Sequence, residues 1–531
     1  MSRAIVIGGG IAGLATAGLL AREGYRVTVL ERNDRTGGRA GTLHRDGFRF
    51  DTGPSWYLMP GVFDHFFELM GTTTAEQLDL VHLDPAYRVF SEPAAGSTSS
   101  AVTVPAGAAR VRALFERLEP GSGAQLDDYL ASASEANDMA VRRFLYNPFT
   151  RLSELATPDV LRRLPRLAML LTRRLDAFAA RRFRHPVIRQ ILGYPAVFLG
   201  TDPRRAPAMY HLMSTLDLDE GVQYPRGGFW GVAERIRALA EEAGADVVLD
   251  AEVTTILTEP SGSRERAYGV RWRDASGAEH LELADIVVSG ADLHHTETAL
   301  LPERLQTYPA RWWRRRTSGP GAVIVMIGVR GSLPELPHHS LFFARDWDTN
   351  FDAIFGASPR LPDPASLYVC KPSATDPDVA PDGHENLFVL IPVPADVEIG
   401  AGGPDGTGST LVERAADAAI DAISRWAGIE DLRDRIVVRE TLGPDDFARD
   451  YHSWRGGMLG PAHILSQSAM FRAQNASRTV DGLYYAGATT APGVGVPMCL
   501  ISAELVLKRI RGDHSTGPTS PRAASVVRKA S

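Results

Sequence analysis

Three glycines near the amino terminus, Gly8, Gly10 and Gly13, have the spacing Gly-x-Gly-x-x-Gly, and an acidic residue, Glu31, follows 18 positions later. In such a pattern the first glycine turns the chain, the second lets a pyrophosphate approach the backbone, and the third lets a helix pack on a strand. Free N–H groups at the helix start bind phosphate, and the carboxylate binds ribose hydroxyls. The pattern therefore predicts a dinucleotide site.

The surrounding residues predict the elements that such a site needs. An apolar run at residues 5–7 indicates a strand, and Leu14, Ala17 and Leu20 then recur at helical spacing. Gly24 ends the helix, and alternation at residues 27–29 indicates a second strand that Glu31 closes. A glycine-punctuated turn without a ligand is the alternative reading. The ordered succession of strand, helix, strand and acid favours the nucleotide.

Composition excludes several other kinds of protein. At 531 residues the chain should form two domains, and its formal charge of −7 is spread along the chain, which argues against a nucleic-acid partner. The two cysteines, Cys370 and Cys499, lie far apart in the sequence, so we expect neither a disulfide framework nor a metal site. A reducing cytoplasm fits this cysteine usage.

The first residues could also be read as a signal peptide, but the nucleotide fingerprint explains them better. No apolar run approaches the roughly 18 residues of a membrane span, and residues 322–329 look like a buried strand. Any membrane contact should therefore be peripheral. We expect the tail, residues 513–531, to be disordered.

A basic segment, residues 159–192, is the candidate for such a contact. Between positions 161 and 190 it contains nine arginines and a single acid, Asp176, and its leucines recur at helical spacing. Pro165 should interrupt or restart the helix. Two readings stay open: a core-facing helix with a solvated polar face, or a basic amphipathic helix that binds anionic lipid.

Elsewhere the pattern predicts regular elements that lead out of the nucleotide domain and back. We expect a hairpin over 87–104, one strand over 246–255 and a turn at 290–292, where His294 and His295 read as solvated. Further predicted helices cover 111–118, 126–144, 231–243 and 411–427. Further strands are predicted over 270–273 and 286–289, and two more near Val323 and Leu387.

The carboxyl-terminal part predicts a second contribution to the same site. Residues 481–488 indicate a strand, a glycine-rich turn follows at 492–497, and a helix should run through Ile510. Pro497 suits the first helical turn. A helix start aimed at a flavin would place partial positive charge near its pyrimidine edge, which stabilises the charge gained on reduction.

Several segments occur in the order typical of one enzyme family: the fingerprint, residues 35–39, the turn 51–55, the helix start at 227–228, residues 464–472, and 487–497 with Ser502 and Ala503. Over nearly its full length the chain resembles the bacterial-type phytoene desaturase family, within the amine oxidase and carotenoid desaturase clan of FAD enzymes. The run 488–491 departs from the Gly-Thr-His type of sequence found in many members. Substrate and product therefore stay open.

The resemblance implies FAD as cofactor. By position, Glu31 and Arg39 would bind FAD, Val253 would meet the adenine through its backbone, and Gly487 would lie beside the flavin. The full predicted set of cofactor residues is Gly8, Gly10, Ile11, Ala12, Gly13, Glu31, Arg32, Gly38, Arg39, Val253, Gly487 and Val496.

The implied fold is α/β, with a Rossmann-like FAD-binding domain, a discontinuous α+β substrate-binding domain and a helical membrane-associating part. We assign residues 1–86, 225–292 and 478–512 to the FAD-binding domain, and 87–224 and 293–477 to the substrate-binding domain.

The resemblance also implies the reaction: desaturation of phytoene to a conjugated carotene, with lycopene as the expected product, at a membrane surface and without nicotinamide. Quinone or oxygen would reoxidise the flavin. The sequence identifies no catalytic base. The alternatives are a later-step carotenoid desaturase, oxygenase or isomerase, an amine oxidase with an aromatic cage, or a non-catalytic membrane flavoprotein or isoprenoid carrier.

Overall fold

A five-stranded parallel sheet lies at the centre of the computed structural model, which describes residues 1–94, 100–151, 153 and 157–521. Its strand order is β20, β13, β1, β2, β9, and every neighbouring pair is parallel. The predicted Rossmann-like sheet is therefore confirmed. The strands are β1 (Arg3–Ile7), β2 (Arg26–Leu30), β9 (Ala245–Val248), β13 (Ile286–Ser289) and β20 (Leu483–Tyr485).

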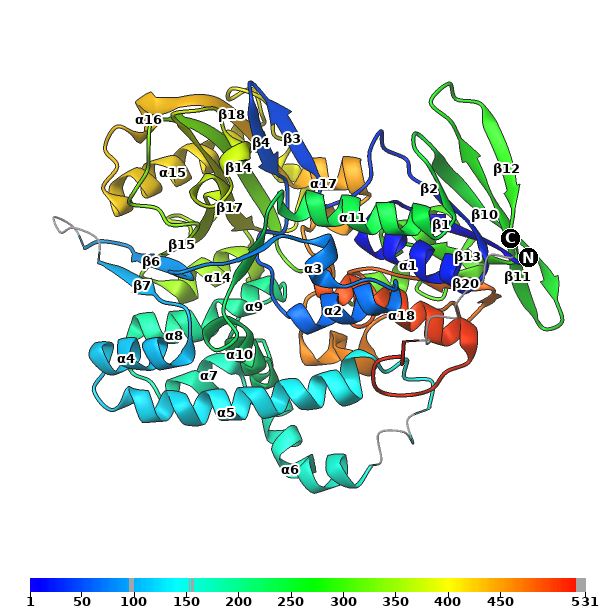
Figure 1. The fold of residues 1–531 in the computed structure, drawn as a ribbon, viewed down its shortest axis with the longest axis horizontal. Coiled ribbons are helices and arrows are strands. Elements are labelled where there is room, and N and C mark those ends of the chain that lie inside the picture. Colours follow the sequence, from blue (N-terminus) through cyan, green and yellow to red (C-terminus); the bar gives the residue numbers. More distant parts are fainter. Residues whose placement is uncertain (95–99, 152, 154–156, 522–531) are drawn as a thin grey trace, which may run out of the picture.

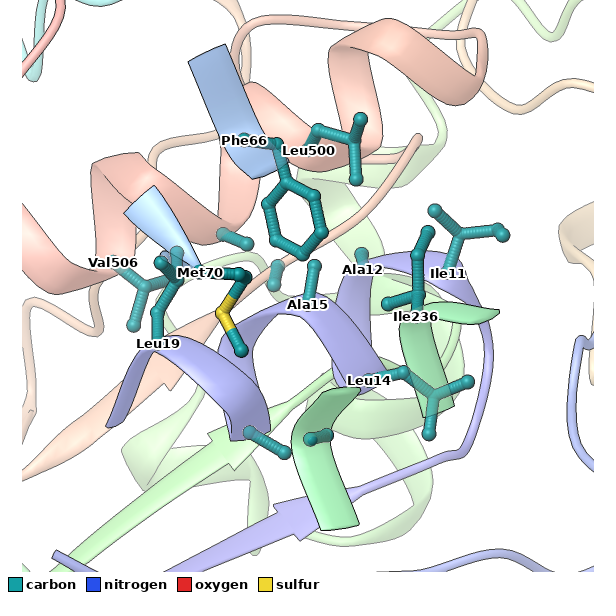
Figure 2. Packing of buried hydrophobic residues seen from close by; sticks show 14 of the residues in the cluster. Ile11, Ala12, Leu14, Ala15, Leu19, Phe66, Met70, Ile236, Leu500 and Val506 are labelled. Atoms are coloured by element: carbon teal, nitrogen blue, oxygen red, sulfur yellow. The ribbon is translucent and has the colours of Figure 1, made fainter. Parts of the chain in front are cut away.

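Helix α1 (Ile11–Arg22) is buried along almost its whole length, because other helices cover it. It packs against α11 (Gly228–Glu242) and α18 (Val496–Arg511), and α2 (Pro60–Leu69) contacts α18. Figure 2 shows Ala12 and Ala15 of α1 beneath Phe66 and Leu500. Small residues on α1 let these helices approach closely, so the start of α1 is held rigidly at the sheet.

A second, mostly antiparallel sheet leaves the first at Asp250, whose φ of 53° interrupts the extended backbone. The single strand predicted over 246–255 is therefore wrong: it is divided between β9 and β10, which belong to different sheets. The strands are β10 (Glu252–Ser261), β11 (Arg264–Arg273) and β12 (Glu279–Leu283), with β19 (Val480–Asp481) beside β11.

A seven-stranded mixed sheet forms the other large part of the molecule (Figure 1), in the order β18, β14, β17, β16, β15, β6, β7. Only β15 and β6 pair in parallel among these neighbours. Helix α15 (Thr410–Ala427) contacts β14, β17 and β18. The strands are β6 (Tyr87–Ser91), β7 (Ala101–Val104), β14 (Gly321–Arg330), β15 (His339–Phe343), β16 (Leu367–Cys370), β17 (His384–Val393) and β18 (Ile436–Leu442).

A group of helices lies beside this mixed sheet, with α5 and α6 along the lower side of Figure 1. The predicted helices at 111–118, 126–144, 231–243 and 411–427 all occur, although α5 ends in a π-helical turn at Val141–Leu145. The group comprises α4 (Ala108–Leu118), α5 (Ser122–Ala140), α6 (Pro158–Thr172), α7 (Leu175–Ala180), α8 (Pro186–Gly193), α9 (Pro195–Phe198) and α10 (Met213–Leu218).

Short elements connect these parts. The hairpin of β3 (Thr42–Arg45) and β4 (Phe48–Asp51) reaches β17, and β5 (Leu80–His82) pairs with β8 (Gln223–Pro225). The remaining helices are α3 (Thr74–Gln77), α12 (Leu293–Ala299), α13 (Ala310–Trp313), α14 (Trp347–Phe355), α16 (Leu432–Arg435) and α17 (Pro444–Tyr451).

Two sequence expectations about backbone order differ from the structure. Pro165 lies inside the single helix α6 and does not interrupt it. Because proline has no N–H, the carbonyl of Leu161, four residues earlier, has no hydrogen-bond donor within the helix. Leu161 and Pro165 are both exposed, so water can donate to that carbonyl instead.

The start of the tail is the second difference. Residues 513–521 pack on α18, where buried Lys508 donates hydrogen bonds to the carbonyls of Ser515 and Gly517, at 2.9 and 2.5 Å. The N–H of Thr519 donates to Glu504 at 2.6 Å. The expectation of disorder from position 513 is therefore wrong up to residue 521, and residues 522–531 lie outside the described part. Within the described residues, no helix is both long and apolar enough to cross a bilayer.

Candidate active site

A cavity of about 670 Å³ extends from the carboxyl ends of β1 and β2 to the helices beside the mixed sheet. In open α/β sheets this edge is where ligands bind. One part of the lining comes from the loops that follow the parallel strands, including residues 37–40, 251–253, 290–292 and 486–499. We call this part the nucleotide lobe, and the remainder the apolar lobe.

The glycine turn has the geometry that phosphate binding requires. Gly8 has a φ of 94°, and Gly10 precedes the first residue of α1. A Cβ atom on Gly13 would lie 2.0 Å from the carbonyl oxygen of Gly8, so only glycine permits this contact between helix and strand. Ile11 and Ala12, the first residues of α1, line the cavity, and the N–H groups of a first helical turn have no partner within the helix, so an anion could bind them.

Glu31 stands at the end of β2 with its carboxylate held by two backbone groups. The N–H of Gly9 donates to Oε2 at 2.6 Å, and the N–H of Asn33 donates to Oε1 at 2.8 Å. Burial raises the pKa of Glu31, while these two hydrogen bonds oppose the rise. The carboxylate lines the cavity with acceptor capacity to spare, as a ribose-binding group must.

Arg39 and Arg32 connect the nucleotide lobe to residues that the sequence did not suggest. The Arg39 guanidinium donates to Ser453 Oγ at 2.6 Å and lies 3.8 Å from the buried carboxylate of Asp292. Arg32 bonds Nε2 of His452 at 2.6 Å. Both arginines line the cavity, so their charges could face a pyrophosphate.

His295 corrects another expectation. It lies in α12 and stacks on His452, with ring centroids 3.7 Å apart and an interplanar angle of 3°. Burial, together with nearby positive charge, lowers its pKa to about 4, so the imidazole is neutral. His295 lines the cavity, and the predicted solvated turn is wrong at this residue because the Asp292 carboxylate accepts from the N–H of His294 and starts a helix there.

The carboxyl-terminal loop closes the same lobe. Gly487 and Val496 line the cavity, and the N–H of Gly487 donates to Ser502 Oγ of α18 at 3.0 Å. His463 fixes the next turn, because its Nε2 accepts from the N–H of Val494 at 3.3 Å. Eleven of the twelve predicted cofactor residues therefore line one cavity, and the twelfth, Gly13, packs behind it. These residues fit a flavin dinucleotide.

The apolar lobe has few polar atoms and ends among exposed hydrophobic side chains. At its rim, Leu171, Leu465, Met470 and Phe471 line the cavity and are 37, 40, 36 and 55% exposed. Its walls include Met139, Leu145, Leu167, Met209, Met213, Leu216, Ile324, Leu341, Phe343, Trp347, Phe351 and Ile354.

A buried carboxyl group stands directly behind this wall. Asp217 Oδ2 accepts hydrogen bonds from the hydroxyls of Tyr87 and Tyr194, at 3.0 and 2.8 Å, and Tyr194 lines the cavity. Burial raises the pKa of Asp217 to about 7. Sequence reasoning missed it, because nothing along the chain relates the two tyrosines to Asp217.

The structure also brings together three side chains that could ligate a metal. His338, His339 and Cys370 are buried, and their donor atoms lie within 4.8 Å of one another. Strand pairing explains the cluster, because β15 and β16 place His339 opposite Cys370. Spacing along the chain could not reveal it. Trp56, which lines the cavity, stacks on His339 at 4.5 Å.

Comparison with known proteins identifies the family. The sequence profile described as flavin containing amine oxidoreductase matches residues 11–510. The chain belongs to the flavin-containing amine oxidoreductase family. The FAD predicted from the sequence is confirmed by this membership, and so is the assignment to the FAD-dependent oxidoreductases.

Among its relatives, this amine oxidoreductase family member is similar to carotenoid and phytoene desaturases. It is 39% identical to the carotenoid 3,4-desaturase of Haloarcula japonica, over 94% of this chain and 96% of the relative. It is 33% identical to the zeta-carotene-forming phytoene desaturase of Myxococcus xanthus, over 99% and 97%. A 4,4'-diapophytoene desaturase of Staphylococcus haemolyticus is 30% identical, over 96% and 99%.

Solved structures share the fold at low sequence identity. A putrescine oxidase double mutant matches with a TM-score of 0.60 and 16% identity, over 96% of this chain and 99% of that one. Cyclohexylamine oxidase from Brevibacterium oxydans matches with a TM-score of 0.56 and 16% identity, also over 96% and 99%. These matches agree with the α/β fold and its parallel sheet.

Proposed function

We propose that this FAD enzyme desaturates a long linear carotene, with phytoene as substrate and lycopene as product. The observation that carries the proposal is the junction of the nucleotide lobe with an apolar lobe in one cavity. A hydrocarbon entering the apolar lobe would reach the cofactor without passing through water. The desaturase relatives, similar over nearly the whole chain, support the same reaction class.

The twelve predicted residues are proposed to hold FAD through backbone and charge. Gly8, Gly10 and the start of α1 would receive the pyrophosphate, and Glu31 the ribose hydroxyls. Arg32 and Arg39 supply positive charge, and both have polar partners that fix their direction. Gly487 and Val496 would meet the other end of the cofactor, at the positive end of α18.

The chemistry divides between cofactor and protein. FAD, when bound, supplies the hydride acceptor. The apolar lobe would orient the hydrocarbon and exclude water, because most of its lining is apolar. Allylic conjugation in the substrate spreads the positive charge that develops, so positioning supplies much of the catalysis.

The proposed electron acceptor is a quinone or oxygen. NADP is disfavoured because the Glu31 carboxylate, which stands where the ribose binds, would repel a 2′-phosphate. The described residues also contain no second glycine turn with the spacing of Gly8, Gly10 and Gly13.

We also propose that the rim of the apolar lobe docks peripherally on an anionic membrane. Helix α6 exposes Leu161 and Leu164 by 57 and 53%, and Leu171 at its end lines the cavity. Arg162 and Arg163 lie exposed on the same helix, and Arg173, also exposed, follows its last residue. Exposed apolar side chains beside basic ones suit a membrane interface, and a carotene would pass from there into the cavity.

A second candidate is desaturation of an already conjugated carotene at its 3,4 bond. The 39% identity with the Haloarcula japonica carotenoid 3,4-desaturase favours it. Both reactions use the same two lobes and differ in which bond lies against the flavin.

Pigment analysis separates the candidates. The purified holoenzyme, with liposomes and a quinone, is given phytoene or lycopene in separate reactions, and products are followed by absorbance and mass. Loss of hydrogen from phytoene with a gain of visible colour supports the first reaction. Loss of hydrogen from lycopene alone supports the second, and no mass change in either rejects carotene desaturation.

A further inference from the structure

Arg472 is a buried cation that has no acidic partner. Its side chain is 4% exposed, and within the described residues no carboxylate forms an ion pair or hydrogen bond with it. Desolvation lowers its pKa to about 10, so the guanidinium stays charged at neutral pH. A buried unpaired charge is costly, and such a charge needs a compensating role or ligand.

Backbone carbonyls surround the guanidinium, and two of them belong to the loop that closes the nucleotide lobe. Nε donates to the Thr490 carbonyl at 2.9 Å, and one Nη donates to the Ala488 carbonyl at 2.6 Å. The other Nη donates to the carbonyls of Pro461 and Gln467, at 3.1 and 3.4 Å. The charge is thus fixed against residues 488–490.

That loop lines the part of the cavity that would hold the cofactor. Ala488 and Thr489 line the nucleotide lobe, next to Gly487. Arg472 also affects His463, which lines the cavity nearby. Burial and the positive charge of Arg472 hold the pKa of His463 well below its usual value. The neutral His463 leaves Arg472 as the cation behind this turn.

We propose that Arg472 sets the reduction potential of the bound flavin. A flavin gains negative charge on reduction, and a fixed cation in a medium of low polarity stabilises that charge more than it stabilises the oxidised form. The four carbonyls hold the cation in place without neutralising it, as a carboxylate would. The inference rests on the family's flavin and not on the carotene substrate.

The competing role is mechanical, in which Arg472 only ties two loops together. Arg472→Met removes the charge and keeps the apolar stem, whereas Arg472→Lys keeps the charge and gives up most of the fork of hydrogen bonds. Arg509→Met is the matched control, because Arg509 is a partly buried arginine of α18 that bonds the carbonyl of Pro148 and lies outside the cavity lining.

The test is the midpoint potential of the bound flavin, measured by reductive titration against a reference dye. Arg472→Met should weaken binding of the reduced cofactor about tenfold more than binding of the oxidised cofactor. This difference lowers the midpoint potential by about 30 mV for a two-electron couple. Arg472→Lys should retain most of the wild-type potential, and Arg509→Met all of it. Equal shifts in the Met and Lys variants, or an unchanged potential in Arg472→Met, would overturn the proposal.

Two further measurements keep the test decisive. If Arg472→Met does not retain flavin, Arg472→Gln replaces it, because the amide still donates to the loop carbonyls without charge. In the unaltered holoenzyme, the absorbance of the reduced flavin should be that of the anionic form across the neutral pH range. A neutral reduced flavin there would contradict a nearby fixed cation.

Discussion

A side chain at position 228 would collide with Asp51, because a Cβ atom built on Gly228 lies 2.1 Å from Asp51 Oδ2. The N–H of Phe229 donates to the same oxygen at 2.7 Å. The 51–55 turn and the 227–228 helix start, two separate family-like segments in the sequence, are therefore one contact that joins β4 to α11.

Substitution of Gly228 by alanine should damage the fold. Gly228 has a φ of 70°, so the change adds backbone strain to the collision, and we expect a loss of about 3–5 kcal/mol in the free energy of unfolding. Gly231→Ala, on the same helix without a close neighbour, should instead gain about 0.5–1 kcal/mol. Denaturant unfolding of both variants measures the difference, and equal stabilities would show that the Asp51 contact yields easily.

Replacing Glu31 should weaken the binding of FAD. Glu31→Ala removes the charged acceptor and should raise the Kd for FAD about ten- to hundredfold, because hydrogen bonds to charged groups contribute about 1.5–3 kcal/mol. Glu31→Gln keeps an acceptor oxygen for one of the Gly9 and Asn33 N–H groups, which bond separate oxygens of Glu31, and should therefore lose less than alanine. The control is Asp34→Asn, since Asp34 is an exposed carboxylate paired with Arg35. FAD titration of the apoprotein is the measurement, and unchanged retention in Glu31→Ala removes Glu31 from the site.

The contrast between Glu31 and Asp292 shows what could be predicted from the sequence. Glu31 was found because its role follows from its distance along the chain to Gly13, within one strand–helix–strand unit. Asp292, 253 residues from its partner Arg39, meets it only because β13 pairs with β1 and ends beside it. His452 likewise reaches His295, 157 residues earlier in the sequence, only through a long-range return of the chain.

The secondary-structure predictions show the same contrast between features set by the local sequence and features set by distant parts of the chain. Long periodic stretches such as α15 and α11 were predicted closely, because local spacing decides them. Asp250 and Pro165 were misjudged, since a positive φ and an exposed carbonyl depend on what surrounds the backbone. The residues of the apolar lobe come from at least six elements, so no local pattern could have collected them.

Membrane binding should depend on the exposed leucines of α6. Leu161→Ser, Leu164→Ser and Leu171→Ser together should lower flotation with anionic liposomes at least tenfold, because each leucine loses about 1 kcal/mol or more of apolar burial. The matched control is Leu281→Ser with Leu283→Ser, two exposed leucines of β12. Equal flotation of the two variants would reject α6 as the docking surface.

The arginines of the basic segment give a second, electrostatic test of the same surface. Reversing Arg173, Arg174, Arg181 and Arg182 to glutamate should release the protein from liposomes while FAD stays bound. Added salt should act similarly on the unaltered protein, because the screening length is about 10 Å at 0.1 M. Flotation that is insensitive to both changes would favour the core-facing reading of the segment.

Asp217→Asn should remove part of the pH dependence of stability. The pKa of Asp217 rises through burial from 3.8 to about 7 in the fold, so its contribution to stability is complete below about pH 4 and is lost as the pH rises through about 7. The loss is at most about 4 kcal/mol. Asparagine still accepts from both tyrosines, so the variant should be more stable than the unaltered protein above pH 7 and similar near pH 4. Parallel pH profiles of the unfolding midpoint would contradict this.

The order of strands in the central sheet also constrains how the protein is made. During synthesis the ribosome releases β1 and β2 first, but β20 and α18 emerge only with residues 483–511. Until then the edge beside β13 is unpaired and one side of α1 lacks its cover. A nascent chain can therefore carry the glycine turn for almost its whole period of translation without a complete cofactor site, and a message shortened by a few dozen codons would yield a protein unable to acquire its flavin.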